Sequence, residues 1–98
     1  MLRRERTKSG DQVKVTFTIP NDPNQPRVSV VGDFNGWDPN ATPLQKRSNN
    51  TRSASVLLEP NKRYAFRYYV SNGEWFNDEA ADAYEPNEYG SQNSIIIT

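Results

Sequence analysis

Apolar and polar residues alternate along much of this chain, a pattern typical of β-strands with one buried face. Between residues 13 and 19 every second position is apolar: Val13, Val15, Phe17 and Ile19. The stretch over residues 62–70 repeats the pattern with Tyr64, Phe66, Tyr68 and Val70. No segment places apolar residues at the helical spacing i, i+3, i+4 and i+7. The pattern therefore predicts an all-β fold.

Shorter segments between turn-rich stretches predict further strands. They cover residues 27–31, 44–47, 51–58, 74–76 and 94–97. Turn residues separate them, as in NDPNQP over residues 21–26 and SNG over residues 71–73. About seven short strands at this spacing indicate a sandwich or a small barrel. Residues 77–92 are expected to form a long polar loop, and such loops are usually functional or disordered.

Length and composition narrow the classes of function. The chain has 98 residues, enough for one domain, with 12 Lys or Arg and 12 Asp or Glu. It has no Cys and no His, which excludes disulfides, thiolate nucleophiles, cysteine-bearing zinc sites and the Ser-His-Asp triad. Because so short a chain rarely encloses a water-excluding cleft, we expect a protein that is not an enzyme and uses no cofactor.

The first ten residues, MLRRERTKSG, carry four basic residues and one Glu, so the rest of the chain is net acidic. Leu2 is the buriable side chain among them. We therefore expect residues 1–10 to form a mobile, deletable arm and residues 11–98 to form the domain. No apolar run follows the basic residues, and no stretch reaches the roughly 18 apolar residues of a membrane span. A cytoplasmic protein without membrane contact is expected.

Both tryptophans follow a turn instead of lying within a strand among aliphatic residues. Trp37 comes directly after Asn-Gly, and Trp75 comes two residues after Asn-Gly. Each could plug one end of the sandwich, or the two could form the plates of a shallow site. Pyranose rings have C–H faces that stack on indole, and their hydroxyls pair with amide and guanidinium groups. The second arrangement therefore suits a sugar.

Three motifs, in this order along the chain, resemble one known family: VVGDFNGWDP at residues 30–39, YAFRYYVSNGEW at residues 64–75 and YGSQN at residues 89–93. The chain resembles the glycogen- and starch-binding modules of carbohydrate-binding module family 48. These modules precede isoamylases and branching enzymes, and the β subunit of AMP-activated protein kinase carries one. The resemblance covers residues 11–98, and ADAY at residues 81–84 is more similar to bacterial single-module proteins than to the kinase subunits.

The resemblance implies an immunoglobulin-like β-sandwich that binds α-1,4-glucan, such as glycogen, starch or maltooligosaccharides, without cleaving it. The two sugar-stacking tryptophans of the family fall on Trp37 and Trp75. Its hydroxyl-binding basic residue and amide fall on Arg67 and Asn93. Tyr89 stands where the kinase subunits carry a sugar-packing Leu, and Arg67 replaces a Lys. Both replacements are compatible with sugar binding, because Tyr stacks and Arg donates in a fork.

Other functions stay open on the residues alone. Calcium-ligand spacing occurs in one turn, although Asx turns explain the same residues: Asp33, Asn35 and Asp38. A glycosidase pair could lie among the carboxylates of the acidic loop: Asp78, Glu79, Asp82, Glu85 and Glu88. Aromatic strands with an Arg could hold single-stranded nucleic acid, but the net acidic body opposes this. An interaction domain of the same fold, docking or regulating a glycogen-metabolising enzyme, is the main alternative.

Overall fold

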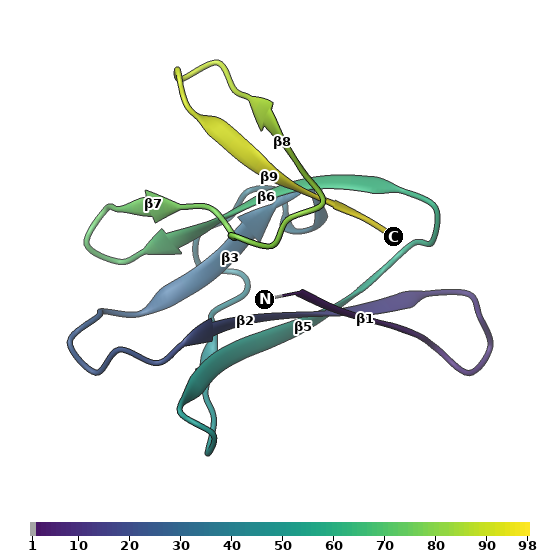
Figure 1. Cartoon of the computed structure of the whole chain (residues 1–98), viewed down its shortest axis with the longest axis horizontal. Helices are drawn as coiled ribbons and strands as arrows, with labels where there is room; N and C mark the ends of the chain where they lie inside the picture. The colour runs from purple at the N-terminus through teal and green to yellow at the C-terminus, as the bar shows by residue number, and fades with distance from the viewer. Residues whose placement is uncertain (1) are drawn as a thin grey trace.

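The computed structural model describes residues 2–98, and in it two antiparallel sheets pack face to face (Figure 1). The first sheet has the order β1 (Leu2–Arg6), β2 (Val13–Pro20), β5 (Thr51–Leu58), β4 (Gln45–Lys46). The second has the order β3 (Val28–Gly32), β6 (Arg63–Val70), β9 (Gln92–Ile97), β8 (Ala83–Pro86), and β7 (Trp75–Phe76) pairs with β6. The predicted all-β sandwich is confirmed. Within residues 2–98 there is no helix long and apolar enough to cross a membrane.

The core lies between the two sheets and is built by the alternating positions of the long strands. From β2 the predicted face is buried: Val13, Val15, Phe17 and Ile19. From β6 the buried members are Phe66, Tyr68 and Val70, while Tyr64 is half-buried at the edge. Phe17 and Phe66 meet across the interface with ring centroids 5.0 Å apart in an edge-on arrangement. Period-two alternation therefore places the opposite face of β6 outside the core.

A buried hydrogen-bond network holds the segment between β7 and β8 against the second sheet. The buried hydroxyl of Tyr68 donates to Asp78 Oδ2 at 2.6 Å, and the Asp78 N–H donates to Ser94 Oγ at 3.1 Å. Burial, followed by the bond to Asp78, raises the pKa of Tyr68 well above its ordinary value. The hydroxyl of Tyr84 in β8 donates to the Asp78 carbonyl.

The expectation of one unbroken polar loop over residues 77–92 is wrong, because this stretch contains β8. The strand pairs with β9 from Ala83↔Ile95 to Pro86↔Gln92. None of its four side chains is buried, so its order comes from backbone pairing and from the Tyr84 anchor. The spacing of apolar residues in the sequence indicates neither the backbone pairing nor the Tyr84 hydrogen bond. β8 and β9 form a hairpin that projects from the sandwich (Figure 1).

Residues 2–6 also differ from the sequence expectation, because they form an edge strand instead of a mobile arm. β1 pairs with β2 from Leu2↔Phe17 to Arg6↔Val13, and Leu2 packs against the core. Arg4 forms an ion pair with Asp82, and its Nε donates to the Ile97 carbonyl at 3.2 Å, so it links the two sheets. Charged side chains suit a sheet edge, where they discourage unwanted pairing. Met1, the first residue of the predicted arm, lies outside the described residues.

Deleting residues 2–6 is therefore expected to lower the free energy of unfolding by about 1–3 kcal/mol, because the Leu2 contact and the Arg4 bridge are lost. Urea unfolding of the truncated and parent chains measures the change. Arg3→Ala is the matched control, since this exposed side chain points away from the core and should matter by about 0.5 kcal/mol or less. If the truncated chain has the same unfolding midpoint as the parent, residues 2–6 do not stabilise the fold and can be deleted.

A buried arginine secures the connection between β2 and β3. Arg52 of β5 is only 4% exposed and points into the turn-rich segment at residues 21–26. Its Nε donates to Asn21 Oδ1 at 2.8 Å, and its Nη1 donates to the Pro26 carbonyl at 2.8 Å. Nη2 donates to the carbonyls of Asp22 and Gln25, both at 2.9 Å. The guanidinium thus satisfies acceptors of a segment that forms no strand of its own.

Candidate functional site

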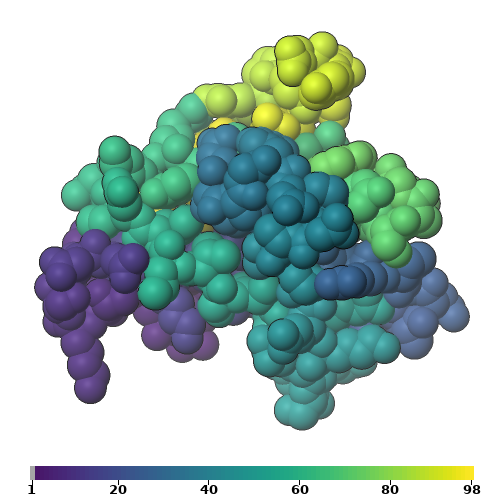
Figure 2. Space-filling view, turned by 180° about the vertical axis from the view of Figure 1, so that it is seen from behind, coloured from purple at the N-terminus to yellow at the C-terminus, as the bar shows by residue number. Residues whose placement is uncertain are grey.

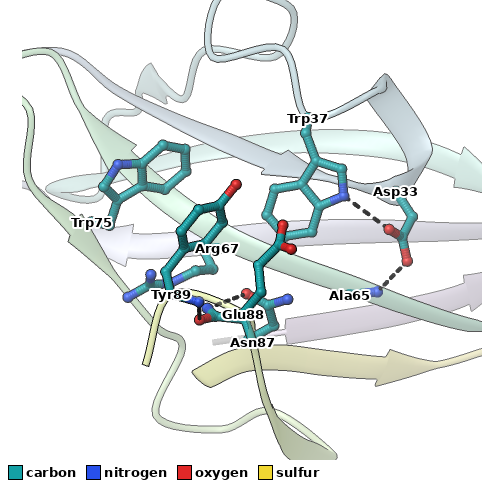
Figure 3. Close-up of a pocket in the computed structure, with 9 residues that line it drawn as sticks. Asp33, Trp37, Ala65, Arg67, Trp75, Asn87, Glu88 and Tyr89 are labelled. Carbon is teal, nitrogen blue, oxygen red and sulfur yellow. Dashed lines mark hydrogen bonds between the residues drawn. The ribbon is translucent and has the colours of Figure 1, made fainter. Parts of the chain in front are cut away.

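The outer face of the second sheet carries an open groove of about 780 Å³. The structure brings all five residues predicted from the sequence to this groove: Trp37, Arg67, Trp75, Tyr89 and Asn93. They come from the turn after β3, from β6 with β7, and from the β8–β9 hairpin. In Figure 2 these segments, coloured blue, light green and yellow, gather on one face of the molecule. Asp33, Ala65, Asn87 and Glu88 complete the lining (Figure 3).

Trp37 is held in an unusual backbone conformation by the turn that follows β3. It lies after η1 (Asp33–Asn35) and Gly36, and its φ of 58° is left-handed, a region that side chains other than Gly and Asn rarely occupy. Its N–H donates to the Gly32 carbonyl at 3.0 Å. The indole Nε1 donates to Asp33 Oδ1 at 2.9 Å, and Asp33 Oδ2 accepts the Ala65 N–H at 2.8 Å. Backbone preference does not favour Trp at this position, so the hydrogen bonds of its N–H and of its indole hold the turn in this conformation.

Trp75 stands on the other side of the groove, on the short strand β7. It is 41% exposed, and its ring centroid lies 4.6 Å from that of Tyr69. The guanidinium carbon of Arg67 lies 6.0 Å from the Trp75 ring centroid, within the range of a cation–π contact. Arg67 Nε is buried and has no hydrogen-bond partner among residues 2–98. Arg67 therefore packs beside Trp75 at the groove, with one buried N–H that no acceptor within residues 2–98 satisfies.

The β8–β9 hairpin brings a third aromatic ring and two amides to the groove. Tyr89 at its tip is 85% exposed. Asn87 Oδ1 accepts the N–H groups of Tyr89 and Ser91 at 3.0 and 3.1 Å, and its Nδ2 donates to Asn93 Oδ1 at 3.2 Å. Asn87 therefore shapes the tip and orients the Asn93 amide at the groove through its oxygen.

Sequence reasoning did not find Asp33, Asn87 and Glu88 as groove residues. Asp33 was explained as a turn residue, and nothing in the sequence pairs its carboxylate with the indole four positions later. Asn87 carries a usable signal, because it is the first residue of the stretch Asn-Glu-Tyr-Gly. An Asn three residues before a Gly is typical of an Asx turn. Glu88 has no local signal, because its position follows from the path of the hairpin.

The structure also bears on the alternatives. Neither tryptophan belongs to the hydrophobic core of residues 2–98, so the two do not plug the sandwich. Turn bonds occupy the candidate calcium ligands: Asn35 Oδ1 accepts the Gly32 N–H at 3.0 Å, and Asp38 Oδ1 accepts the Asn40 N–H at 2.8 Å. No group of three or more Asp or Glu residues within residues 2–98 is arranged to hold a metal ion. Three carboxylates of the acidic loop are engaged elsewhere, in Asp78–Tyr68, Asp82–Arg4 and Glu85–Arg63.

The fold and the groove together define a small β-sandwich module with an exposed aromatic surface. Residues 7–85 match the sequence model of carbohydrate-binding module 48, the isoamylase N-terminal domain. The chain therefore belongs to carbohydrate-binding module family 48, whose members are non-catalytic binding modules with an immunoglobulin-like fold.

Longer curated proteins contain a similar segment. The 1,4-alpha-glucan branching enzyme GlgB of Aquifex aeolicus is 34% identical over 68 residues, which are 68% of this chain and 11% of that enzyme. The amylopullulanase of Thermoanaerobacter thermohydrosulfuricus is 32% identical over 84 residues, or 82% of this chain and 5% of the relative. GlgB 2 of Rhizobium etli is 33% identical over 81 residues, or 76% and 10%. The chain thus spans about a tenth or less of the length of these relatives.

Proposed function

We propose that this protein binds α-1,4-glucan in the groove on the outer face of the second sheet and does not cleave it. The observation that carries the proposal is the convergence of Trp37, Trp75 and Tyr89 on one open groove, from segments far apart in the sequence. An open groove with exposed rings suits a long polymer that is bound along its side. It lacks the enclosure from water that hydrolysis by a carboxylate pair requires.

The side chains of the groove match both surfaces of a glucose unit. The indoles of Trp37 and Trp75 offer flat apolar faces for the C–H side of the pyranose ring. Arg67 and the Asn93 amide supply N–H donors for hydroxyl oxygens, and the Glu88 carboxylate supplies acceptors for hydroxyl protons. A sugar hydroxyl both donates and accepts hydrogen bonds. A neutral sugar chain can therefore bond to the N–H donors and to the carboxylate acceptors of the groove.

The relatives support the same polymer as the ligand. Two of those described above are named as 1,4-alpha-glucan branching enzymes and one as an amylopullulanase. We infer that this module holds glycogen or a related glucan for an enzyme that acts on it, either in the same polypeptide or as a separate partner.

Titration with maltoheptaose, followed by tryptophan fluorescence and by calorimetry, tests the proposal. We expect saturable binding in the millimolar to micromolar range, which corresponds to about 4–8 kcal/mol. Cellohexaose is the matched ligand control, since its β-linked chain presents the same glucose units in a different shape and should bind far more weakly. Release of reducing sugar from glycogen would contradict the non-catalytic part. A folded protein that binds no glucan would favour the alternative of a protein-docking domain.

Glucan affinity is expected to change by less than twofold between 50 and 200 mM salt, because a neutral polymer releases no counterions. Calorimetric titration of maltoheptaose at both salt concentrations measures this. Binding of a single-stranded oligonucleotide serves as the comparison and should be undetectable at both. A steep loss of affinity with salt, or tight oligonucleotide binding, would instead indicate a nucleic-acid surface.

A further inference from the structure

We propose that Asp33 is a positioning residue that fixes the ring of Trp37 at the edge of the groove. The inference rests on the proposed function, because the fixed ring is one of the surfaces on which the glucan stacks. Asp33 contacts the ring through one carboxylate oxygen and the central strand β6 through the other, as the dashed lines in Figure 3 show. The carboxylate therefore connects the indole to β6, which pairs with β3, β7 and β9.

Trp37 depends on this connection more than Trp75 depends on any single contact. Trp75 stacks on Tyr69 and lies beside the Arg67 guanidinium. Among residues 2–98 no aromatic ring or cation packs on Trp37 in this way, and the one hydrogen bond of its side chain goes to Asp33. Without that bond, the half-buried indole loses the polar contact that fixes its rotamer. Ordering the Trp37 ring during binding then costs free energy, whereas in the parent protein the ring is already ordered.

The surrounding backbone explains why an acidic residue occupies this position. β3 ends at Gly32, which pairs with Phe66, and the next N–H along β6 toward that edge is that of Ala65. Asp33 Oδ2 accepts this N–H, so the carboxylate continues the hydrogen bonding of the sheet after the strand itself has ended. Gly32 allows the turn to sit this close, because a Cβ there would lie 2.5 Å from the Ala65 carbonyl oxygen.

Both oxygens of Asp33 face N–H donors, so two acceptors are required in one side chain. Asparagine has nearly the same shape but carries one acceptor and one donor group. In Asp33→Asn one of the two bonds is lost, and an N–H then faces another N–H. If the amide oxygen stays on the indole, that bond is still weaker, because its acceptor is no longer charged and the side chain has lost its bond to Ala65. The substitution therefore tests the connection without removing side-chain volume.

Amide and indole resonances of ¹⁵N-labelled protein report the ring position without any glucan. The Trp37 indole proton of the parent should resonate downfield and exchange slowly with solvent. In Asp33→Asn it should shift upfield and exchange at least several times faster, whereas the Trp75 indole resonance should stay in place. Asp38→Asn is the matched control, because Asp38 lies in the same turn outside the groove and its Oδ1 bond to Asn40 survives as an amide oxygen.

A double-mutant cycle then tests whether Asp33 acts through the ring. Asp33→Asn alone should weaken maltoheptaose binding about five- to tenfold. In a Trp37→Phe background, where no indole N–H exists, the same substitution should weaken binding less than twofold. An equal loss in both backgrounds, or an Asp33→Asn variant that binds like the parent, would overturn the proposal.

The proposal and the proposed function fail in different ways. A parent protein that does not bind maltoheptaose contradicts the function, yet its Trp37 indole resonance still reports whether Asp33 holds the ring. A rapidly exchanging Trp37 indole proton in the parent contradicts the positioning role even if glucan binds tightly. If urea unfolding shows that Asp33→Asn is not folded, two other measurements test whether Asp33 holds the ring. They are the Trp37 indole resonance of the parent and the glucan affinity of Trp37→Phe, a variant in which the Asp33–Ala65 bond stays intact.

Discussion

Replacing Trp37 or Trp75 by alanine is expected to weaken maltoheptaose binding about ten- to a hundredfold while the sandwich stays folded. Covering one ring face with sugar contributes about 1–3 kcal/mol, and each 1.4 kcal/mol is about a factor of ten in affinity. Each substitution should matter separately, because either one removes one of the two indole faces on which the glucan stacks. Calorimetric titration measures the affinities, and urea unfolding of the same samples measures stability.

Two comparisons sharpen this prediction. Leu57→Ala is the control, since Leu57 is also exposed but belongs to β5 of the opposite sheet, and it should leave the affinity unchanged. Arg67→Ala should cost less than either tryptophan, about 1 kcal/mol, because water replaces part of an exposed hydroxyl contact. Tryptophan variants that bind like the parent would refute the site. Variants that unfold, with losses of about 3–5 kcal/mol, would mean that the rings support the core.

Replacing Arg52 by methionine is expected to lower the free energy of unfolding by about 3 kcal/mol. Methionine keeps most of the aliphatic stem but removes the donor to four oxygen acceptors on residues 21–26. The Asp22 carbonyl keeps the Gln25 N–H, and the other three acceptors, on half-buried or exposed residues, together cost about 3 kcal/mol when they lose the guanidinium. Chemical denaturation measures the loss. The glucan affinity of the remaining folded protein should not change, because this segment does not line the groove.

Arg47→Met provides the matched control for Arg52. Arg47 is an exposed arginine whose Nε and Nη2, within residues 2–98, donate to Ser53, at 2.9 and 3.4 Å. Its replacement should therefore lower stability by about 1 kcal/mol or less. Equal effects at the two positions would show that residues 21–26 hold their own conformation without the buried guanidinium.

The sandwich could be predicted because its long strands bury one face each. Phe17 stands in strict alternation with polar residues, Tyr68 belongs to a run with a large apolar or aromatic residue at every second position, and the structure confirms both faces. β1 and β8 escaped prediction for the opposite reason. Their order comes from backbone pairing at sheet edges and from single long-range contacts, such as Arg4 with Asp82 and Tyr84 with Asp78, which leave no period in the sequence.

Only those residues of the groove that are uncommon in their sequence context could be predicted from the residues alone. A tryptophan after a turn is conspicuous, so Trp37 and Trp75 could be singled out from the residues, while Arg67, Tyr89 and Asn93 needed the family resemblance. Asp33 was not predictable as their partner. Its role depends on Ala65, 32 positions away, whose N–H points toward it only after β3 and β6 have paired.

The groove has no counterpart in the unfolded chain, because its parts meet only when β3, β6, β7 and the β8–β9 hairpin are assembled. A ligand that binds only the folded form shifts the unfolding equilibrium, by about 2.7 kcal/mol when its free concentration is a hundred times the dissociation constant. Glucan would therefore raise the melting temperature of the module in proportion to the logarithm of its concentration. If the groove binds glucan as proposed, the polymer itself therefore acts as a stabilising agent of the folded module.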